Sequence, residues 1–219
     1  MRVLKLLPNL SYQIGGSMDK ELNIKTEGIQ MGKDTFHFHR YEPTPYEVIK
    51  ELFDQVPLKK EDVLVDFGCG KGRLNFYLHH RFHCRTVGIE FNPEYYEEAM
   101  LNLKYYRSNN KENINFECVS AMNYQIKPEE NYFYFFNPFS PQIFIGIIQH
   151  ILKSYEKHPR NITLLLYYPD EEYLYYLEHS TPFQITMNVP LHAIKNTDER
   201  DRYVVLTYNL LSSCTHQIT

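Results

Sequence analysis

The stretch Val63-Leu-Val-Asp66-Phe-Gly68-Cys-Gly70-Lys-Gly72-Arg73 decides the fold of this 219-residue chain. A short apolar run, typical of a buried strand, ends in an acid. Three glycines follow at alternate positions, before a helix expected from Leu74 to His80. Glycine lacks the Cβ atom that keeps a ligand away from the backbone, and the free N–H groups at a helix start attract polar or anionic groups. The stretch therefore predicts a cradle for a nucleotide-like ligand.

The glycine spacing excludes two common phosphate-binding loops. A Walker loop needs Gly-Lys followed by a hydroxyl residue, whereas Gly70-Lys71 is followed by Gly72. The dinucleotide fingerprint needs a third glycine where this chain has Arg73. The remaining Asp-x-Gly-x-Gly-x-Gly pattern resembles the first motif of the class I S-adenosylmethionine-dependent methyltransferases, which are Rossmann-like. The resemblance implies S-adenosyl-L-methionine as cofactor. It implies cofactor contacts from Asp66, Phe67, Gly68, Cys69, Gly70, Gly72 and Arg73.

A second acid stands 24 positions after Asp66, where Thr86-Val-Gly-Ile-Glu90 forms a short apolar strand candidate. In doubly wound folds, an acid at the end of the second strand accepts hydrogen bonds from two vicinal ribose hydroxyls. We therefore expect Glu90 and its neighbour Phe91 at the cofactor. The same placement suits a nicotinamide cofactor, so an oxidoreductase of that type stays open, and so does a merely solvated glutamate at a strand end.

Strands and helices alternate along most of the chain. Strands are predicted at 62–66, 85–90, 114–118, 131–136, 161–167, 183–189 and 202–210, and helices at 72–82, 93–107, 141–156 and 170–179. Before the first of these strands, a further helix is expected to begin with Thr44 as N-cap and Pro45 at its first position. Glu47 is expected to complete a capping box with Thr44. Pro57 is expected to end it.

This order predicts an α/β fold. Alternating strands and helices require a mostly parallel sheet, and two final strands without a helix between them require an antiparallel hairpin. We therefore predict a doubly wound, seven-stranded, mostly parallel sheet with a C-terminal antiparallel hairpin. Residues 1–40 are expected to form an N-terminal arm or cap, and residues 41–219 the class I methyltransferase domain.

The third strand is followed by Ser120 and Ala121, at a position where many of these methyltransferases carry an acid that contacts the adenine amine. A serine hydroxyl can accept the same hydrogen bond, and the backbone at Ala121 can bind the ring edge. The resemblance therefore places both residues at the cofactor. An ordinary loop serine is the alternative interpretation of Ser120.

After the fourth strand the chain reads Phe135-Phe-Asn137-Pro138-Phe139-Ser-Pro141. Methyltransferases that act on amino groups of nucleic acid or protein often carry Asn/Asp-Pro-Pro-Tyr/Phe there, and its oxygens hold the target nitrogen. Asn137 and Pro138 match, whereas Phe139 departs from the pattern. We take Asn137, Pro138 and Phe139 as candidate catalytic residues, with Asn137 also at the cofactor and Phe139 and Tyr41 at the substrate. The alternative is an Asn-Pro turn before the helix that Pro141 opens.

The composition limits the kinds of partner that the protein is expected to bind. A net charge of −4 and a pI near 6.2 argue against a broad duplex-binding face, since such binding depends on neutralising phosphates. The 19 tyrosines and 14 phenylalanines can stack single-stranded bases, although most are expected in the core. His79, His80, His83 and Cys84 have metal-ligand spacing, but we expect a solvated helix end and no metal.

Four cysteines without paired spacing indicate reduced thiols. The sequence contains no run of about 18 apolar residues, the length that a membrane-spanning helix needs. We therefore expect a cytoplasmic protein without a membrane partner.

The sequence thus predicts an S-adenosylmethionine-dependent methyltransferase that transfers a methyl group by in-line displacement. Its acceptor is unidentified, with an amino nitrogen of single-stranded nucleic acid or of protein as the candidates. A noncatalytic cofactor- or RNA-binding module with the same fold is the alternative, favoured by the missing acid at Ser120.

Overall fold

A seven-stranded sheet organises the computed structural model, which describes residues 15–28, 42–137, 139–191 and 198–210. The strands are β1 (Val63–Phe67), β2 (Arg85–Glu90), β3 (Ile114–Cys118), β4 (Tyr132–Phe136), β5 (Ile162–Tyr167), β6 (Gln184–Pro190) and β7 (Arg202–Tyr208). Their order in the sheet is β3-β2-β1-β4-β5-β7-β6. Strands β1 to β5 pair in parallel, whereas β7 runs antiparallel to both β5 and β6.

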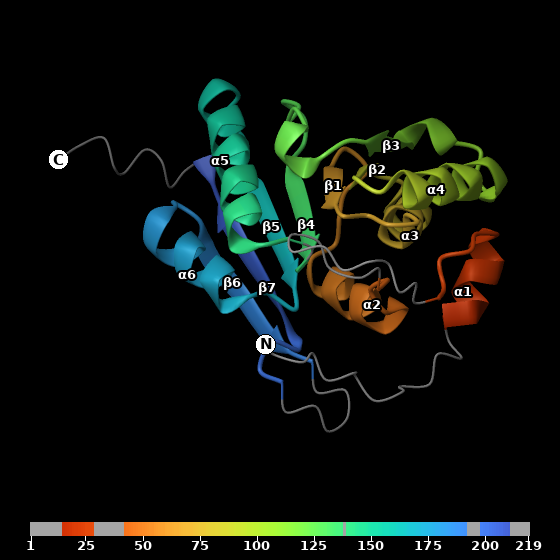
Figure 1. Ribbon diagram of the computed structural model, residues 1–219, viewed down its shortest axis with the longest axis horizontal. Helices are drawn as coiled ribbons and strands as arrows, with labels where there is room; N and C mark the ends of the chain where they lie inside the picture. The colour runs from red at the N-terminus through yellow and green to blue at the C-terminus, as the bar shows by residue number, and fades with distance from the viewer. Residues whose placement is uncertain (1–14, 29–41, 138, 192–197, 211–219) are drawn as a thin grey trace.

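The helices lie on both faces of this sheet. They are α1 (Gly15–Leu22), α2 (Tyr46–Gln55), α3 (Arg73–Phe82), α4 (Pro93–Tyr105), α5 (Pro141–Lys157) and α6 (Glu171–Ser180), with short 3-10 turns η1 (Lys111–Asn113) and η2 (Ala121–Asn123). Helices α5 and α6 cover one face, and α2, α3 and α4 cover the other (Figure 1). The predicted fold class is confirmed, and the predicted strands and the four helices after residue 70 end within two residues of the observed bounds.

The two faces of β1 explain how the sheet is buried and how Asp66 is aimed. Val63, Val65 and Phe67 belong to the core cluster under α5 and α6, whereas Leu64 belongs to the cluster under α2 and α3. Side chains alternate along a strand, so Asp66 shares the face of Leu64. Asp66 therefore points to the side from which α3 starts.

The edge strand β6 is irregular. Its pairing with β7 shifts register between Ile185 and Met187, and Pro190 ends the strand. The shift changes the face that packs: Ile185 packs against the core cluster under α5 and α6, whereas Met187 and Val189 pack against the cluster under α2 and α3.

The predicted capping box at the start of α2 is wrong. Pro45 is the N-cap residue, and no side chain caps the helix. The Thr44 hydroxyl instead pairs with the Tyr134 hydroxyl at 2.9 Å. A contact with a strand 90 residues away therefore replaces the local one.

Helix α1 was not predicted, because a short segment that begins with two glycines shows no clear helical period. It packs against α3, and its last residue, Leu22, is buried. Asp19 of the same helix is also buried, with its carboxylate bonded to the backbone and hydroxyl of Thr26.

The close contact between β2 and β3 generates a stability prediction. A Cβ atom on Gly88 would lie 2.5 Å from Phe116 Cδ1 and 2.7 Å from Cys69 Sγ. Gly88→Ala should therefore lower the free energy of unfolding by about 1 to 3 kcal/mol in urea denaturation.

Gly146→Ala is the matched control in α5. Its new Cβ would meet only the flexible end of Met122, and alanine favours a helix over glycine. We expect Gly146→Ala to be neutral or stabilising, and equal losses in both variants would contradict the proposed crowding at Gly88.

Candidate cofactor and active site

The glycine loop, residues 68–72, follows β1 and is shaped by positive backbone φ angles. These are 82° at Gly68, 54° at Gly70 and 84° at Gly72, a region that side chains with a Cβ atom disfavour. The Gly68 N–H donates to the Ile89 carbonyl at 2.8 Å, and the Gly72 N–H donates to the Cys69 carbonyl at 2.9 Å. The loop is therefore a fixed bend anchored to the end of β2.

Gly72 has a packing role in addition. A Cβ atom there would lie 2.6 Å from Phe116 Cζ and 2.9 Å from Phe76 Cε2. Gly72 thus allows α3 to begin directly against the aromatic side chains of the core.

Glu90 is bound to the glycine loop. Its Oε2 accepts a hydrogen bond from the Gly70 N–H at 2.8 Å, and its Oε1 accepts one from the Asn92 N–H at 2.8 Å. The Phe91 N–H is a further nearby donor, and a carboxylate has about four acceptor positions, so capacity remains for a donor from a ligand. The side chain is half-buried at the carboxyl end of β2. This arrangement fits the vicinal hydroxyls of a ribose.

Asp66 lies beside Glu90 in a less hydrated environment. It is 5% exposed, between Gly88 of β2 and Tyr134 of β4 in the sheet register. Burial, together with the nearby Glu90 carboxylate, raises the pKa of Asp66 to about 8, and burial also raises the pKa of Glu90. A cation between them would lower both pKa values again and stabilise the ionised carboxylates, so the pair favours a ligand that carries positive charge, such as a sulfonium or ammonium group.

The segment after β3, which was predicted to contact the adenine, lies beside Glu90 at the end of β2. The Val119 N–H donates to the Glu90 carbonyl at 3.0 Å, which brings the segment before Ser120 beside the end of β2. Ser120 is half-buried at the start of η2, whereas the Ala121 side chain is buried in the core. Phe91 is 55% exposed. The structure thus gathers Glu90, Phe91 and Ser120 at neighbouring strand ends.

Three predicted loop residues use their side chains for packing. Phe67 and Cys69 are buried in separate core clusters. The Arg73 guanidinium donates to Thr26 Oγ1 at 2.7 Å and lies 4.6 Å from the Tyr46 ring centroid. The loop therefore offers a ligand mainly its backbone. The Cys69 thiol is buried near Asp66 and Glu90, and burial together with these two carboxylates raises its pKa, whereas the Phe67 ring and the Arg73 guanidinium have other partners.

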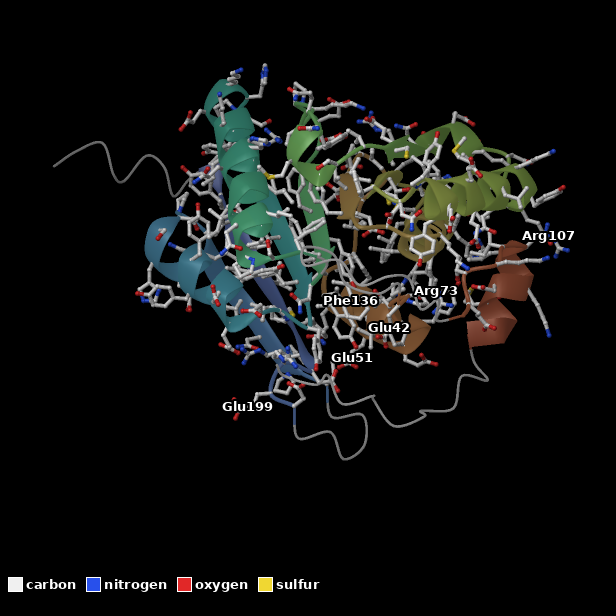
Figure 2. The ribbon with its side chains drawn as sticks, viewed as in Figure 1. Glu42, Glu51, Arg73, Arg107, Phe136 and Glu199 are labelled. Atoms are coloured by element: carbon white, nitrogen blue, oxygen red, sulfur yellow. The ribbon has the colours of Figure 1, made fainter. Side chains whose placement is uncertain are left out.

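The segment after β4 carries the predicted catalytic residues. Asn137 has a φ of 38°, in the left-handed region, and directly follows Phe136, the last residue of β4, which Figure 2 labels. The Phe139 ring is buried in the core, and its carbonyl accepts a hydrogen bond from the Tyr173 hydroxyl of α6. Of these residues, the structure brings Asn137 to the strand ends and places the Phe139 ring elsewhere. Pro138 and Tyr41 lie outside the described residues.

Two site-supporting tyrosines were missed in the sequence. Tyr134 is buried next to Asp66, and Tyr173 orders the loop after Asn137. Strand alternation could have placed Tyr134 on the face of Asp66. The long-range contact of Tyr173 left no local signal.

The histidine cluster at the end of α3 differs from its prediction. His79 is 1% exposed, with Nδ1 3.0 Å from the Tyr106 hydroxyl, so a solvated helix end is the wrong description for this residue. Burial lowers the pKa of His79. Among the described residues, no group of three or more His, Cys, Asp or Glu side chains has metal-binding geometry.

The strand order, the glycine bend and its two acids define the fold of the class I S-adenosylmethionine-dependent methyltransferases. A family model described as a methyltransferase domain matches residues 44–200. The chain therefore belongs to this methyltransferase-domain family. The predicted resemblance is confirmed, and the predicted enzyme class and cofactor are confirmed at the level of family and fold.

Parts of this chain are similar in sequence to curated methyltransferases. A protein-lysine N-methyltransferase from Saccharolobus islandicus (strain REY15A) is 32% identical over 65 residues, 29% of this chain and 40% of that protein. An H3 lysine-79 specific histone-lysine N-methyltransferase from Dictyostelium discoideum is 28% identical over 111 residues, 46% of this chain and 6% of that protein. The matches thus span less than half of each curated relative.

A solved structure of similar fold contains the cofactor product. The RNA methyltransferase from Salinibacter ruber, in complex with S-adenosyl-L-homocysteine, has a TM-score of 0.54 and 18% sequence identity. The superposition covers 76% of this chain and 92% of that one. This likeness shows that the two proteins share a fold.

The Glu90 contacts predict an effect on cofactor affinity. Glu90→Ala removes the acceptor of the Gly70 N–H and the expected ribose contacts, so binding of S-adenosylhomocysteine should weaken by about 1.5 to 3 kcal/mol in titration calorimetry. Exposed Glu61 provides the control substitution Glu61→Ala. Unchanged affinity in Glu90→Ala would remove Glu90 from the site.

The raised pKa of Asp66 predicts a pH-dependent stability. The folded protein holds this proton up to about pH 8, whereas the unfolded chain releases it near the ordinary value of 3.8. The stability that the proton confers is therefore complete below pH 3.8 and is lost as the pH rises through about 8. Asp66→Asn should gain stability relative to the wild type between pH 5 and about pH 8.5, as measured by urea denaturation. Parallel pH profiles of the two proteins would refute this assignment.

Proposed function

We propose that this protein transfers a methyl group from S-adenosylmethionine to an amino nitrogen, with the lysine side chain of a protein as the first candidate acceptor. The observation that carries the proposal is the Glu90 carboxylate, which is held by the Gly70 N–H beside the buried carboxyl of Asp66. This geometry supports a nucleoside ligand that carries positive charge. The names of both curated relatives specify lysine, which supports a protein acceptor.

The charge of the chain supports the same choice. A net charge of −4 disfavours a polyanionic acceptor, since nucleic-acid affinity depends mainly on neutralised phosphates. Single-stranded nucleic acid is the second candidate acceptor. The RNA methyltransferase of similar fold is consistent with that alternative.

The roles of this chain's residues follow from the placement of their polar atoms. When bound, S-adenosylmethionine supplies an activated sulfonium methyl group. Glu90 would accept hydrogen bonds from its ribose, and the pair of acids at 66 and 90 would favour its positive charge. A lysine ammonium would first release a proton to solvent, and the Asn137 side-chain oxygen would then accept a hydrogen bond from the neutral amine and orient its lone pair. The new N–C bond would form as the S–C bond breaks, leaving a methylammonium product and S-adenosylhomocysteine. An amide is no base, so Asn137 would contribute only to positioning, as one part of the roughly 7 to 11 kcal/mol that complete orientation of the reactants can supply.

The cytoplasm is the compartment that we propose. Cys69, Cys84 and Cys118 are free thiols among the described residues, which supports a reducing environment. Burial raises the pKa of Cys84 to about 12, so this thiol resists oxidation. Within the described part of the chain, no helix is both long and apolar enough to span a bilayer.

The assay that tests this function separates turnover from binding. Radiolabelled S-adenosylmethionine should label a pool of lysine-containing proteins. Asn137→Ala should lower kcat on the order of a hundredfold, because the acceptor loses its orientation. Its affinity for S-adenosylhomocysteine should change little in calorimetry.

Asn109→Ala, in the exposed segment before β3, is the control and should retain full activity. Equal losses of turnover and affinity in Asn137→Ala would make Asn137 a structural residue. Labelling confined to RNA would favour the second acceptor. Cofactor binding without turnover on either pool would favour the noncatalytic module.

A further inference from the structure

Residues 22–26, called the strap below, begin at the last residue of α1 and pack near the glycine loop. Leu22, Ile24 and Thr26 are buried, whereas the residues between them are exposed. Leu22 and Ile24 share a core cluster with Cys69, a residue of the loop itself. Figure 1 shows α1 next to α3, whose first turn the loop enters. An N-terminal segment is thus in apolar contact with the expected cofactor loop.

Asn102 of α4 joins the strap to the loop by hydrogen bonds. Its Nδ2 donates to the Lys71 carbonyl at 3.0 Å and to the Lys25 carbonyl at 3.1 Å, and its Oδ1 accepts from the Lys25 N–H at 2.8 Å. Asn102 is 6% exposed, so water cannot readily replace these bonds. One buried amide therefore connects the backbone of both segments.

Arg73 forms a second link, which is independent of Asn102. Its Nε donates to Thr26 Oγ1 at 2.7 Å, and the Thr26 hydroxyl donates in turn to Asp19 Oδ1 at 2.8 Å. The Thr26 N–H also donates to Asp19, at 2.6 Å. Figure 2 shows Arg73 in the region between α1 and α2. A buried cation directly after Gly72 is thus bridged to a buried carboxylate of α1.

Both links end at residues 71 to 73, and the side chain of Arg73, which the sequence predicted at the cofactor, binds the strap instead. A glycine-rich loop loses more backbone freedom than other segments when it is ordered, so ordering it before the ligand arrives strengthens binding. We propose that the strap holds the glycine loop in its cofactor-binding shape, with Asn102, Thr26 and Arg73 as positioning residues. The proposal rests on the proposed function, because it takes this loop as the cofactor site.

The test compares two asparagines whose side chains each join two segments, Asn102 being buried and Asn131 half-buried. Asn102→Leu removes the bonds between strap and loop. Asn131→Leu removes two side-chain bonds of similar length, to the Val63 N–H and to Asp62, at the amino-terminal ends of the central strands β1 and β4. Asn102→Leu should weaken S-adenosylhomocysteine binding about tenfold in calorimetry. It should also accelerate hydrogen exchange at the Gly70 and Gly72 amides, while kcat at saturating cofactor stays within about twofold. Asn131→Leu should lower stability without either change.

Thr26 variants test the second link without a large change in volume. Thr26→Ser keeps the hydroxyl that joins Arg73 to Asp19 and should bind S-adenosylhomocysteine like the wild type. Thr26→Val loses the hydroxyl and should bind more weakly. Equal affinities of the Ser and Val variants, together with equal effects of the two asparagine variants, would overturn the proposal.

Failure of the strap is distinguishable from failure of the proposed function. If the wild type does not bind S-adenosylhomocysteine, the proposed function is wrong. Hydrogen exchange at the Gly70 and Gly72 amides of the ligand-free protein then decides whether the strap orders the glycine loop. Exchange that is unchanged in Asn102→Leu overturns the strap.

Discussion

The hydrogen bond from the Gly70 N–H to the Glu90 carboxylate is the constraint on which the site depends. It connects the loop after the first strand to the end of the second, so it requires β1 and β2 to lie side by side in parallel. The observed register, with Asp66 opposite Gly88, satisfies this requirement. Gly88 in turn leaves room for Phe116 and Cys69. The strand register that packs the sheet therefore also fixes the positions of Asp66 and Glu90.

Burial gives the two acids different roles. Asp66 is almost completely enclosed and keeps its proton at neutral pH, whereas Glu90 is partly hydrated and accepts two backbone N–H groups. A positively charged ligand would stabilise the ionised form of either acid. Such a ligand gains more beside a carboxyl that is poorly hydrated, because less water competes with it.

The sequence predicted the elements well, because their periodicity and their glycines are local properties. The sequence could not predict which distant residues the long side chains contact. Arg73 was assigned to the cofactor because it ends the motif, but its guanidinium reaches Thr26, a residue 47 positions earlier. Phe139 and His79 are buried for the same kind of reason, since their partners come from distant elements. Asn137 remains a predicted catalytic residue.

The edges of the sheet bear on how the protein behaves at high concentration. An unpaired strand edge invites another chain to add a strand, which leads to aggregation. On β6 the shifted register near Met187 and the terminal Pro190 interrupt a regular row of donors and acceptors. On β3, Glu117 forms an ion pair with Lys127, which places charge beside that edge. Both outer strands are thus poor templates for fibril growth.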